Sequence, residues 1–187
     1  MSTPDIPAGT WTIDASHSEV GFSVRHLAVS KVKGNFETFE GTLTIAEDPL
    51  ASTVEATIDL SSINTRDAQR DEHLRSGDFF NTDASPKMTF RSTSVTPSGS
   101  DYTVAGELTI RDITKQVELD LEFNGVSPDP WGGTRAGFSA TGEINRKDFG
   151  IDFNIPLDGG GFVIGDKIKL FLEVEAVLQI FAQLLVE

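Results

Sequence analysis

The 187-residue sequence predicts an all-β protein whose strands pair antiparallel and form a barrel or a sandwich. The first observation is alternation of apolar and polar residues along whole segments, the period of a strand with one buried face. The second is that turn-forming residues separate these segments. The third is that only one segment has a helical composition. Eight or nine strands without helices to cover them must close into a barrel or fold into a sandwich.

The alternating segments follow one another along the whole chain. They are clearest in residues 53–60, 116–123 and 167–174, and weaker in residues 10–14, 19–29, 32–45, 87–95, 102–111 and 135–145. Antiparallel pairing is expected because buried parallel strands are continuously apolar. Within the later segments, Gly106, Gly137 and Gly142 predict bulges or corners of the kind that bend a barrel.

Residues 64–76 break the alternation and predict one short, mostly polar helix. Asn64 and Asp67 supply the residue types that cap a helix start, and Gly77 is suited to the left-handed position after its end. Phe79 and Phe80 follow directly, and we expect them to anchor the helix to the barrel.

Composition excludes several functions. The 15 basic and 29 acidic residues give a net charge of −14 with no basic cluster, so nucleic acid is not an expected partner. The absence of cysteine excludes disulfides and thiolate chemistry. With no recognisable signal or membrane-spanning segment in the sequence as given, we expect a cytoplasmic protein consisting of one domain over residues 1–187.

The histidines are the first candidates for chemistry. His26 shares the parity of Phe22 and Val24, so it is expected on the apolar face of its strand, as a hydrogen-bonded core residue, a polar contact in a ligand cavity or a metal ligand. With Asp14 and His17 it would complete a set of two histidines and one carboxylate, typical of a metal-dependent enzyme.

A hydrolase has no specific support. Ser18, His17 and Asp14 are too close in sequence to form a triad, and no nucleophile elbow, phosphate loop or dinucleotide fingerprint occurs.

The inward-facing residues predict an uncharged interior. A barrel of about eight strands is near the boundary between a filled core and a cavity for one small apolar ligand, and periodicity leaves both alternatives open. Small inward residues such as Ala56 and Ala140 leave room for a ligand. The candidate ligand-binding residues are Phe22, Val24, His26, Ile58, Met88, Phe90, Leu108, Ile110, Leu119, Leu121, Phe138, Leu170 and Leu172.

Several motifs resemble one known family. The opening residues 11–26 (WTIDASHSEVGFSVRH) are similar to the signature of the YceI family of polyisoprenoid-binding, lipocalin-like proteins. Further similar motifs follow in order, among them residues 70–75 (RDEHLR), 86–90 (PKMTF), 106–110 (GELTI) and 146–150 (RKDFG). The resemblance covers about residues 9–177, which leaves residues 178–187 as a C-terminal extension.

The resemblance implies an eight-stranded, lipocalin-like antiparallel barrel with the helix inserted near one end. It further implies non-enzymatic binding, transport or storage of a long-chain isoprenoid lipid, of the polyprenyl phosphate or quinone type, in an apolar tunnel. No cofactor is implied. His17, Ser18 and His73 then become possible head-group contacts or braces of the barrel, and we expect a homodimer that contacts membranes at most transiently. The alternatives are a small metal-dependent enzyme using Asp14, His17 and His26, and a stress-related scaffold.

Overall fold

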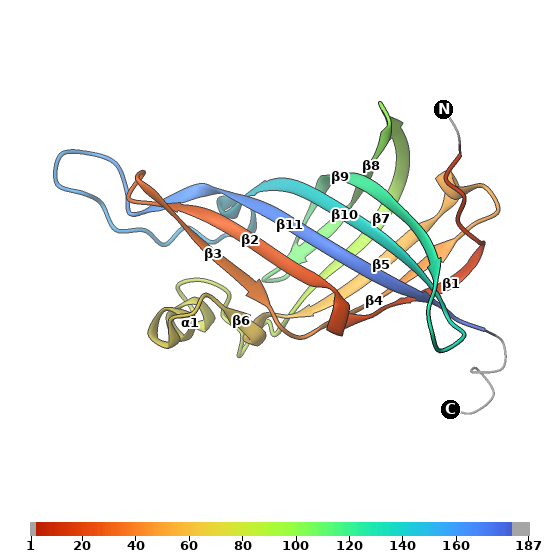
Figure 1. The fold of residues 1–187 in the computed structure, drawn as a ribbon. Helices are drawn as coiled ribbons and strands as arrows, with labels where there is room; N and C mark the ends of the chain where they lie inside the picture. Colours follow the sequence, from red (N-terminus) through yellow and green to blue (C-terminus); the bar gives the residue numbers. More distant parts are fainter. Residues whose placement is uncertain (1–2, 181–187) are drawn as a thin grey trace.

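The computed structural model describes residues 3–180, and β-strands form most of this part of the chain (Figure 1). One α-helix, α1 (Ala68–Arg75), and four short 3₁₀ helices accompany the strands within these residues. The strands are β1 (Gly9–Ile13), β2 (Glu19–His26), β3 (Ser30–Phe36), β4 (Phe39–Ile45), β5 (Thr53–Asp59), β6 (Ile63–Asn64), β7 (Lys87–Ser98), β8 (Asp101–Ile110), β9 (Ile113–Pro128), β10 (Thr134–Asn145) and β11 (Ile164–Leu178). The 3₁₀ helices are η1 (Ala15–His17), η2 (Pro49–Ala51), η3 (Leu60–Ser62) and η4 (Arg146–Phe149).

The strands form a closed antiparallel barrel with eight strand positions. Its ladder runs β1-β4-β5-β7-β8-β9-β10-β11, and pairing of β1 with β11 closes the ring. The first part of β11 pairs with β2, and its last part pairs with β1. β1 and β2 therefore occupy one strand position that η1 interrupts, and the expected eight-stranded barrel is confirmed.

The prediction of one unbroken strand over residues 32–45 is wrong in detail. β3 pairs with β2 and β4 pairs with β1, and the chain breaks between them at Glu37 and Thr38. The Glu37 N–H donates to the Ser62 carbonyl oxygen, and the Thr38 N–H donates to the Ser62 hydroxyl 3.0 Å away. These two bonds to η3 replace strand-to-strand hydrogen bonds. The alternation of apolar and polar side chains does not predict such a contact.

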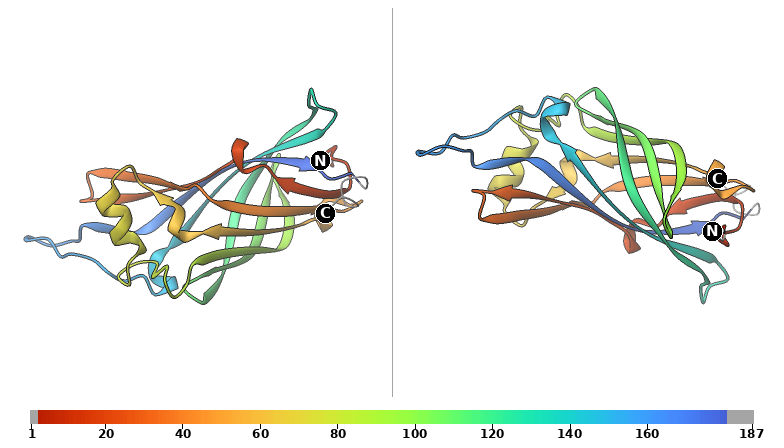
Figure 2. Two further views of the ribbon diagram at one scale, coloured as in Figure 1. Left: turned by 90° about the horizontal axis from the view of Figure 1, so that it is seen from below. Right: turned by 90° about the horizontal axis from the view of Figure 1, so that it is seen from above.

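The barrel has two different ends (Figures 1 and 2). The β2–β3 hairpin and the loop before β11 project at one end, near α1. The N-terminal segment, the β4–β5 connection and the β7–β8 hairpin lie toward the other end. Residues 65–86, which include α1, connect β6 to β7 at the first of these two ends.

α1 is shorter than predicted. Residues 63–64 pair with β3 as β6, so the helix begins only after Asp67, whose side chain accepts from the Arg70 N–H at 3.0 Å. Ser76 ends the helix and donates through its hydroxyl to the His73 carbonyl oxygen. The expectation of a left-handed Gly77 is wrong, because the left-handed residue in this turn is Asn81, with φ of 51°.

Apolar side chains close the barrel at the α1 end. Phe79 and Phe149 are buried there, in contact with Leu108, Ile110 and Ile151. Phe80 packs against the same cluster and against a second one that contains Phe36 and Leu60. The predicted anchoring by Phe79 and Phe80 is confirmed. No helix within residues 3–180 is long and apolar enough to span a membrane.

Two of the three predicted glycine irregularities coincide with shifts in strand register. Gly106 lies opposite a bulge between Ser92 and Ser94, and the β9–β10 register shifts next to Gly137. Gly142 instead forms the last pair of the β9–β10 ladder, with Leu119.

Candidate functional site

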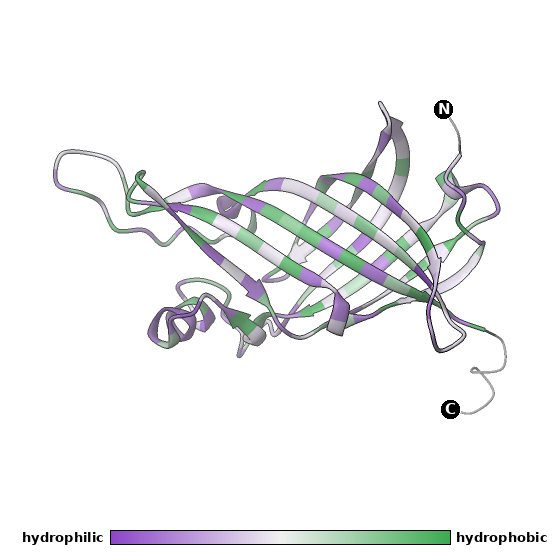
Figure 3. Ribbon diagram, in the orientation of Figure 1, coloured by the Kyte–Doolittle hydropathy of each residue, from purple (hydrophilic) through white to green (hydrophobic). Residues whose placement is uncertain are grey.

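The inward faces of the barrel strands enclose a cavity of about 250 Å³. β9 shows how the sequence produces it, because successive side chains of a strand point to opposite faces. Its inward residues line the cavity and its outward residues are exposed acids, which gives the striped colouring of the strands in Figure 3. The inward set is Val117, Leu119, Leu121 and Phe123, and the outward set is Glu118, Asp120 and Glu122.

The cavity lining is apolar along the whole barrel. Among the described residues that line it, none is charged and none is histidine; Ser52, Thr53, Ser92 and Tyr102 are its polar members. The lining on β9 extends from Val117 to Phe123, about 20 Å along the strand at about 3.4 Å per residue. The cavity is therefore an elongated apolar chamber.

The interior is hollow and not fully packed. Phe22, Phe90 and Leu172 all point inward, yet they are only half-buried. In a filled core such side chains would lose nearly all their accessible surface to neighbouring atoms. Ala56 and Ala140, which also line the cavity, leave space that larger side chains would occupy. The structure therefore favours a cavity over a packed core.

One end of the cavity is closed by aromatic side chains. The rings of Phe22 and Phe36 lie 5.7 Å apart between centroids, and Phe36 meets Phe80 edge-on at 5.9 Å. These rings lie on the α1 side of the barrel, next to Ile58 and Leu60.

The cavity opens at the other end. The only exposed residues in its described lining are Leu50, in the connection from β4 to β5, and Thr53, the first residue of β5. Pro4 and Ile6 from the N-terminal segment line the same region, as does Tyr102 at the start of β8. The loops around these residues therefore form the mouth.

Most of the predicted ligand-binding residues lie at the cavity. Those that line it are Phe22, Ile58, Met88, Phe90, Leu108, Leu119, Leu121, Phe138, Leu170 and Leu172. Their contact with a ligand stays a prediction.

Val24, His26 and Ile110 do not line the cavity. Val24 and His26 belong to the part of β2 that extends past the aromatic end wall, where His26 pairs with Ser30 and Ile164. Ile110 is 3% exposed and belongs to the apolar cluster that closes the α1 end. Strand parity predicts the face of a residue correctly but not its height along the barrel.

The three expected head-group residues also lie outside the cavity lining. Ser18 donates through its hydroxyl to the Glu175 carbonyl oxygen and accepts from the Glu175 N–H. His73 lies 2.8 Å from a carboxylate oxygen of Asp78, and its ring meets Phe79 and Phe153 edge-on. These contacts favour a role in bracing the barrel over contact with a ligand head group.

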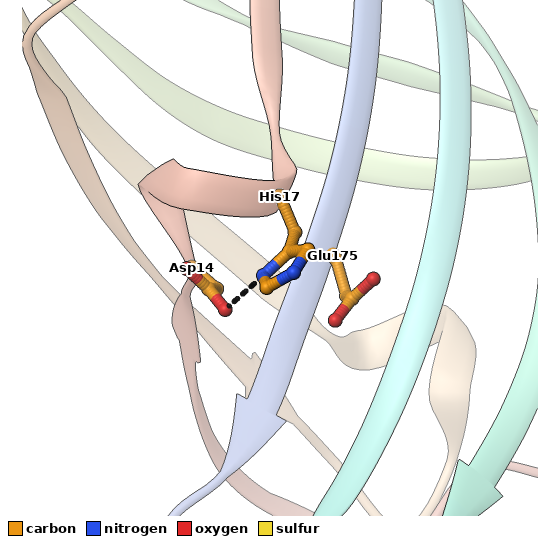
Figure 4. Close-up of side chains that lie close together, drawn as sticks. All are labelled: Asp14, His17 and Glu175. Carbon is orange, nitrogen blue, oxygen red and sulfur yellow. Dashed lines mark hydrogen bonds and ion pairs between the residues drawn. The ribbon is translucent and has the colours of Figure 1, made fainter. Parts of the chain in front are cut away.

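His17 belongs to an ion-pair cluster on the outside of the barrel. Its Nδ1 lies 2.8 Å from Asp14 Oδ2, and Glu175 approaches from β11 (Figure 4). Arg135 Nη1 donates to Asp14 at 2.8 Å and also to Glu175, and Arg135 Nε donates to Asp129 at 3.1 Å.

The protonation states follow from these contacts. Hydrogen bonds from the Ser16 hydroxyl and then from the Arg135 guanidinium hold the pKa of Asp14 far below its usual range. The carboxylates of Asp14 and Glu175 in turn raise the pKa of Arg135. Asp14 is therefore held as a carboxylate, and the Arg135 guanidinium already supplies a cation beside it.

The predicted set of Asp14, His17 and His26 is not assembled. Asp14 caps η1 and His17 is its last residue, before β2 begins, whereas His26 is the last residue of β2. Asp14, His17 and Glu175 do bring their ligand atoms within 4.8 Å of one another, but the Arg135 guanidinium bonds both carboxylates. The contacts describe a salt-bridge network and give no support to metal chemistry.

Comparison with known proteins identifies the family. Residues 11–176 match the family model of the YceI-like domain, which spans most of the chain. The chain belongs to the YceI family.

Relatives of this YceI-family chain include a UPF0312 protein of Staphylococcus aureus. It is 45% identical over 170 residues, which cover 88% of this chain and 95% of the relative. The crystal structure of the Campylobacter jejuni YCEI protein is similar with a TM-score of 0.69 and 32% identity, covering 89% of this chain and 96% of that one. A polyisoprenoid binding domain from Saccharophagus degradans has the same fold, with a TM-score of 0.70 at 15% identity, covering 90% and 98% respectively.

Sequence reasoning missed the mouth residues of this YceI barrel. Pro4, Ile6 and Leu50 lie outside the strands, where no alternation of apolar and polar residues indicates a buried face. Val20, in contrast, shares the parity of Phe22 and lines the cavity, so the alternation of β2 contains the signal that identifies it.

Proposed function

We propose that this YceI-family protein binds a long-chain isoprenoid lipid in the barrel cavity and carries or stores it without chemical change. The observation that carries the proposal is the elongated cavity, whose described lining contains no charged side chain. The fold shared with the polyisoprenoid binding domain from Saccharophagus degradans supports the choice of ligand class.

The affinity would come from removal of the chain from water. Each buried methylene contributes about 0.8 kcal/mol, less the cost of ordering a flexible chain and of losing its free motion. At about 250 Å³, the cavity lies just below the range of roughly 300–1,000 Å³ that is usual for small-molecule pockets. It is suited to one slender chain and not to a lipid with several tails.

A role without catalysis is consistent with the residues around the ligand space. General acid–base and nucleophilic catalysis need a titratable or activated group within hydrogen-bond reach of the substrate. The described lining holds no histidine, carboxylate or lysine. Ser92 lines the cavity, but its hydroxyl accepts from the Val54 N–H at 2.8 Å and has no base beside it.

The decisive experiment is native mass spectrometry of freshly purified protein. We expect a stoichiometric adduct with the mass of an isoprenoid lipid, and release of a prenyl species on solvent extraction. A clean apo mass together with an extract free of prenyl lipids would contradict the proposal.

Two variants on β9 test the location of the ligand. Leu121→Trp places a large ring into the cavity and should abolish the adduct, whereas Glu122→Trp adds the same ring on the exposed face and should leave it unchanged. Circular dichroism melts of both variants show whether the barrel stays folded, since overpacking costs about 1–3 kcal/mol.

The cytoplasmic location, the homodimer and the transient membrane contact expected from the sequence stay predictions. Cell fractionation, light scattering after size exclusion and vesicle co-sedimentation test them in turn. The sequence leaves three roles open for the C-terminal extension at 178–187: an extra strand, a cover for the end of the barrel, or self-association. Residues 181–187 of it lie outside the described residues, and Leu178 ends β11, where it pairs with Trp11.

A further inference from the structure

The mouth of the cavity consists of three segments, residues 3–8, 46–53 and 96–103. They contribute Ile6, Leu50 and Tyr102 to the cavity lining, and they come together from the N-terminus, the β4–β5 connection and the β7–β8 hairpin. Any polar end of a ligand whose chain fills the cavity through this opening must lie among these segments.

The mouth carries negative charge only. Asp5, Glu47, Asp48 and Asp101 are exposed members of the three segments, which contain no lysine, arginine or histidine. None of these four carboxylates forms an ion pair within the described residues. Asp48 caps η2 by accepting a hydrogen bond from the Leu50 N–H at 3.0 Å, which keeps its carboxylate next to a residue of the cavity lining.

The interior gives an anionic group no alternative position. Burial of an ionised group without a partner costs far more than the chain gains from a few methylenes. The lining within residues 3–180 holds no cation to pair with a phosphate. A phosphate, which has a charge of about −1.5 to −2 at neutral pH, would therefore stay at the mouth, close to four like charges.

A groove on the side of the barrel has the same sign of charge. It lies next to the point where the β9–β10 ladder ends at Leu119 and Gly142, and it shares Val117, Ile144 and Leu170 with the cavity lining. Its lysines are outnumbered by its carboxylates; the charged residues are Lys115, Lys169, Glu118, Asp120, Glu143 and Asp148. A head group leaving the barrel sideways would also meet net negative charge.

We propose that the acidic mouth selects isoprenoid ligands whose polar end is uncharged and discriminates against prenyl phosphates. This inference rests on the proposed function and makes it more specific, since it names the ligand class and assigns Glu47, Asp48 and Asp101 as residues that determine specificity. Like-charge repulsion across the rim weakens with ionic strength, because the screening length falls from about 10 Å at 0.1 M salt to about 3 Å at 1 M.

The test compares a prenol and the prenyl phosphate of the same chain length by calorimetry with delipidated protein. We expect the prenol to bind severalfold more tightly at low salt, and the difference to shrink as salt is added. Glu47→Lys should raise the affinity for the phosphate severalfold and leave the prenol unchanged. Glu72→Lys makes the same change of charge on α1, at the opposite end of the barrel, and should alter neither affinity (Figure 1).

The outcomes separate the two proposals. Equal or tighter binding of the phosphate to the wild type overturns the inference and leaves the proposed function standing. Loss of the phosphate affinity in Lys115→Ala or Lys169→Ala also overturns the inference alone, because the side groove would then hold the head group. Binding of neither ligand by folded protein overturns the proposed function and this inference with it.

Discussion

Asp14 connects a local turn to the closure of the barrel. It follows β1, caps η1 by accepting from the Ser16 N–H, and pairs with Arg135 on β10, 121 residues away in the chain. Arg135 also bonds Glu175 on β11, so this one guanidinium joins three strand positions at the place where β1 meets β11. The guanidinium thus places a positive charge beside both carboxylates, which favours a structural role for the Asp14–His17 pair.

The low pKa of Asp14 predicts a specific dependence of stability on pH. Because its pKa is lowered on folding, Asp14 contributes stability above its unfolded value of about 3.9 and loses that contribution as the pH falls toward its folded pKa. We expect Asp14→Asn to lower the melting temperature at pH 7 and to differ progressively less from the wild type below about pH 4.

Thermal melts of both proteins at pH 7, 4 and 3 measure this difference. An Asp14→Asn penalty that is the same at all three pH values would show that the carboxylate charge is not what stabilises the site.

The sequence predicts the positions of some inward-facing residues correctly and those of others wrongly. Alternation identifies Phe22 and Leu172 as inward-facing because side-chain direction is a local property of a strand. It misplaces His26, because whether an inward residue meets the cavity or lies beyond its end wall depends on Phe36 and Phe80, which come from distant elements.

The β2–β3 hairpin contains two residues in an unfavourable conformation. In its three-residue connection, 27–29, Leu27 and Ala28 have φ of 53° and 58°, the left-handed pair at the centre of a type I′ turn that Asn-Gly sequences normally supply. The left-handed conformation costs a residue with a side chain roughly 1–2 kcal/mol. The hairpin therefore keeps an apolar tip at the expense of stability.

Replacing Ala28 with glycine should stabilise the protein. Glycine adopts positive φ without a steric penalty, and after its larger loss of chain entropy we expect a net gain of about 0.5–1 kcal/mol in the free energy of unfolding. Urea titrations of Ala28→Gly and the wild type give this value. A matched Ala105→Gly change within β8, where φ is not positive, should instead be destabilising. A loss of stability in Ala28→Gly would contradict the turn assignment.

The sequence predicts that the strands and the helix exist, but it does not predict where they are interrupted or where they begin. The alternation of β5, β9 and β11 appears directly in the sequence, whereas the break between β3 and β4 depends on hydrogen bonds to Ser62, 24 residues from Thr38. The predicted start of α1 is too early because the pairing of Asn64 with Asn35 on β3 is a non-local contact.

At the scale of the molecule, the acidic surface and the apolar cavity lining come from opposite faces of the same strands. The outward positions of β9 carry Glu118, Asp120 and Glu122, and the mouth adds further carboxylates. A protein with a net charge of −14 is repelled by an anionic lipid surface. Exchange of a lipid would therefore depend on the charge of the membrane that donates it.

This repulsion predicts the rate of ligand uptake from vesicles. In 10 mM salt, where the screening length is about 30 Å, a fluorescent prenol should transfer to the protein faster from zwitterionic vesicles than from vesicles rich in anionic lipid. At about 1 M salt, where that length falls to about 3 Å, the two rates should converge. Faster uptake from anionic vesicles at low salt would show that a basic surface, and not the acidic mouth, meets the membrane.

The sequence by itself determined the class of fold, the uncharged cavity lining and the acidic exterior of this YceI barrel. Each of these follows from side-chain alternation, which is local and repeats along every strand. The tertiary structure decided the ring closure through β1 and β11, the aromatic end wall, the mouth and the Asp14–Arg135–Glu175 network. These features join residues far apart in the chain, and the free energy of such contacts depends on which distant surfaces the folded backbone brings together.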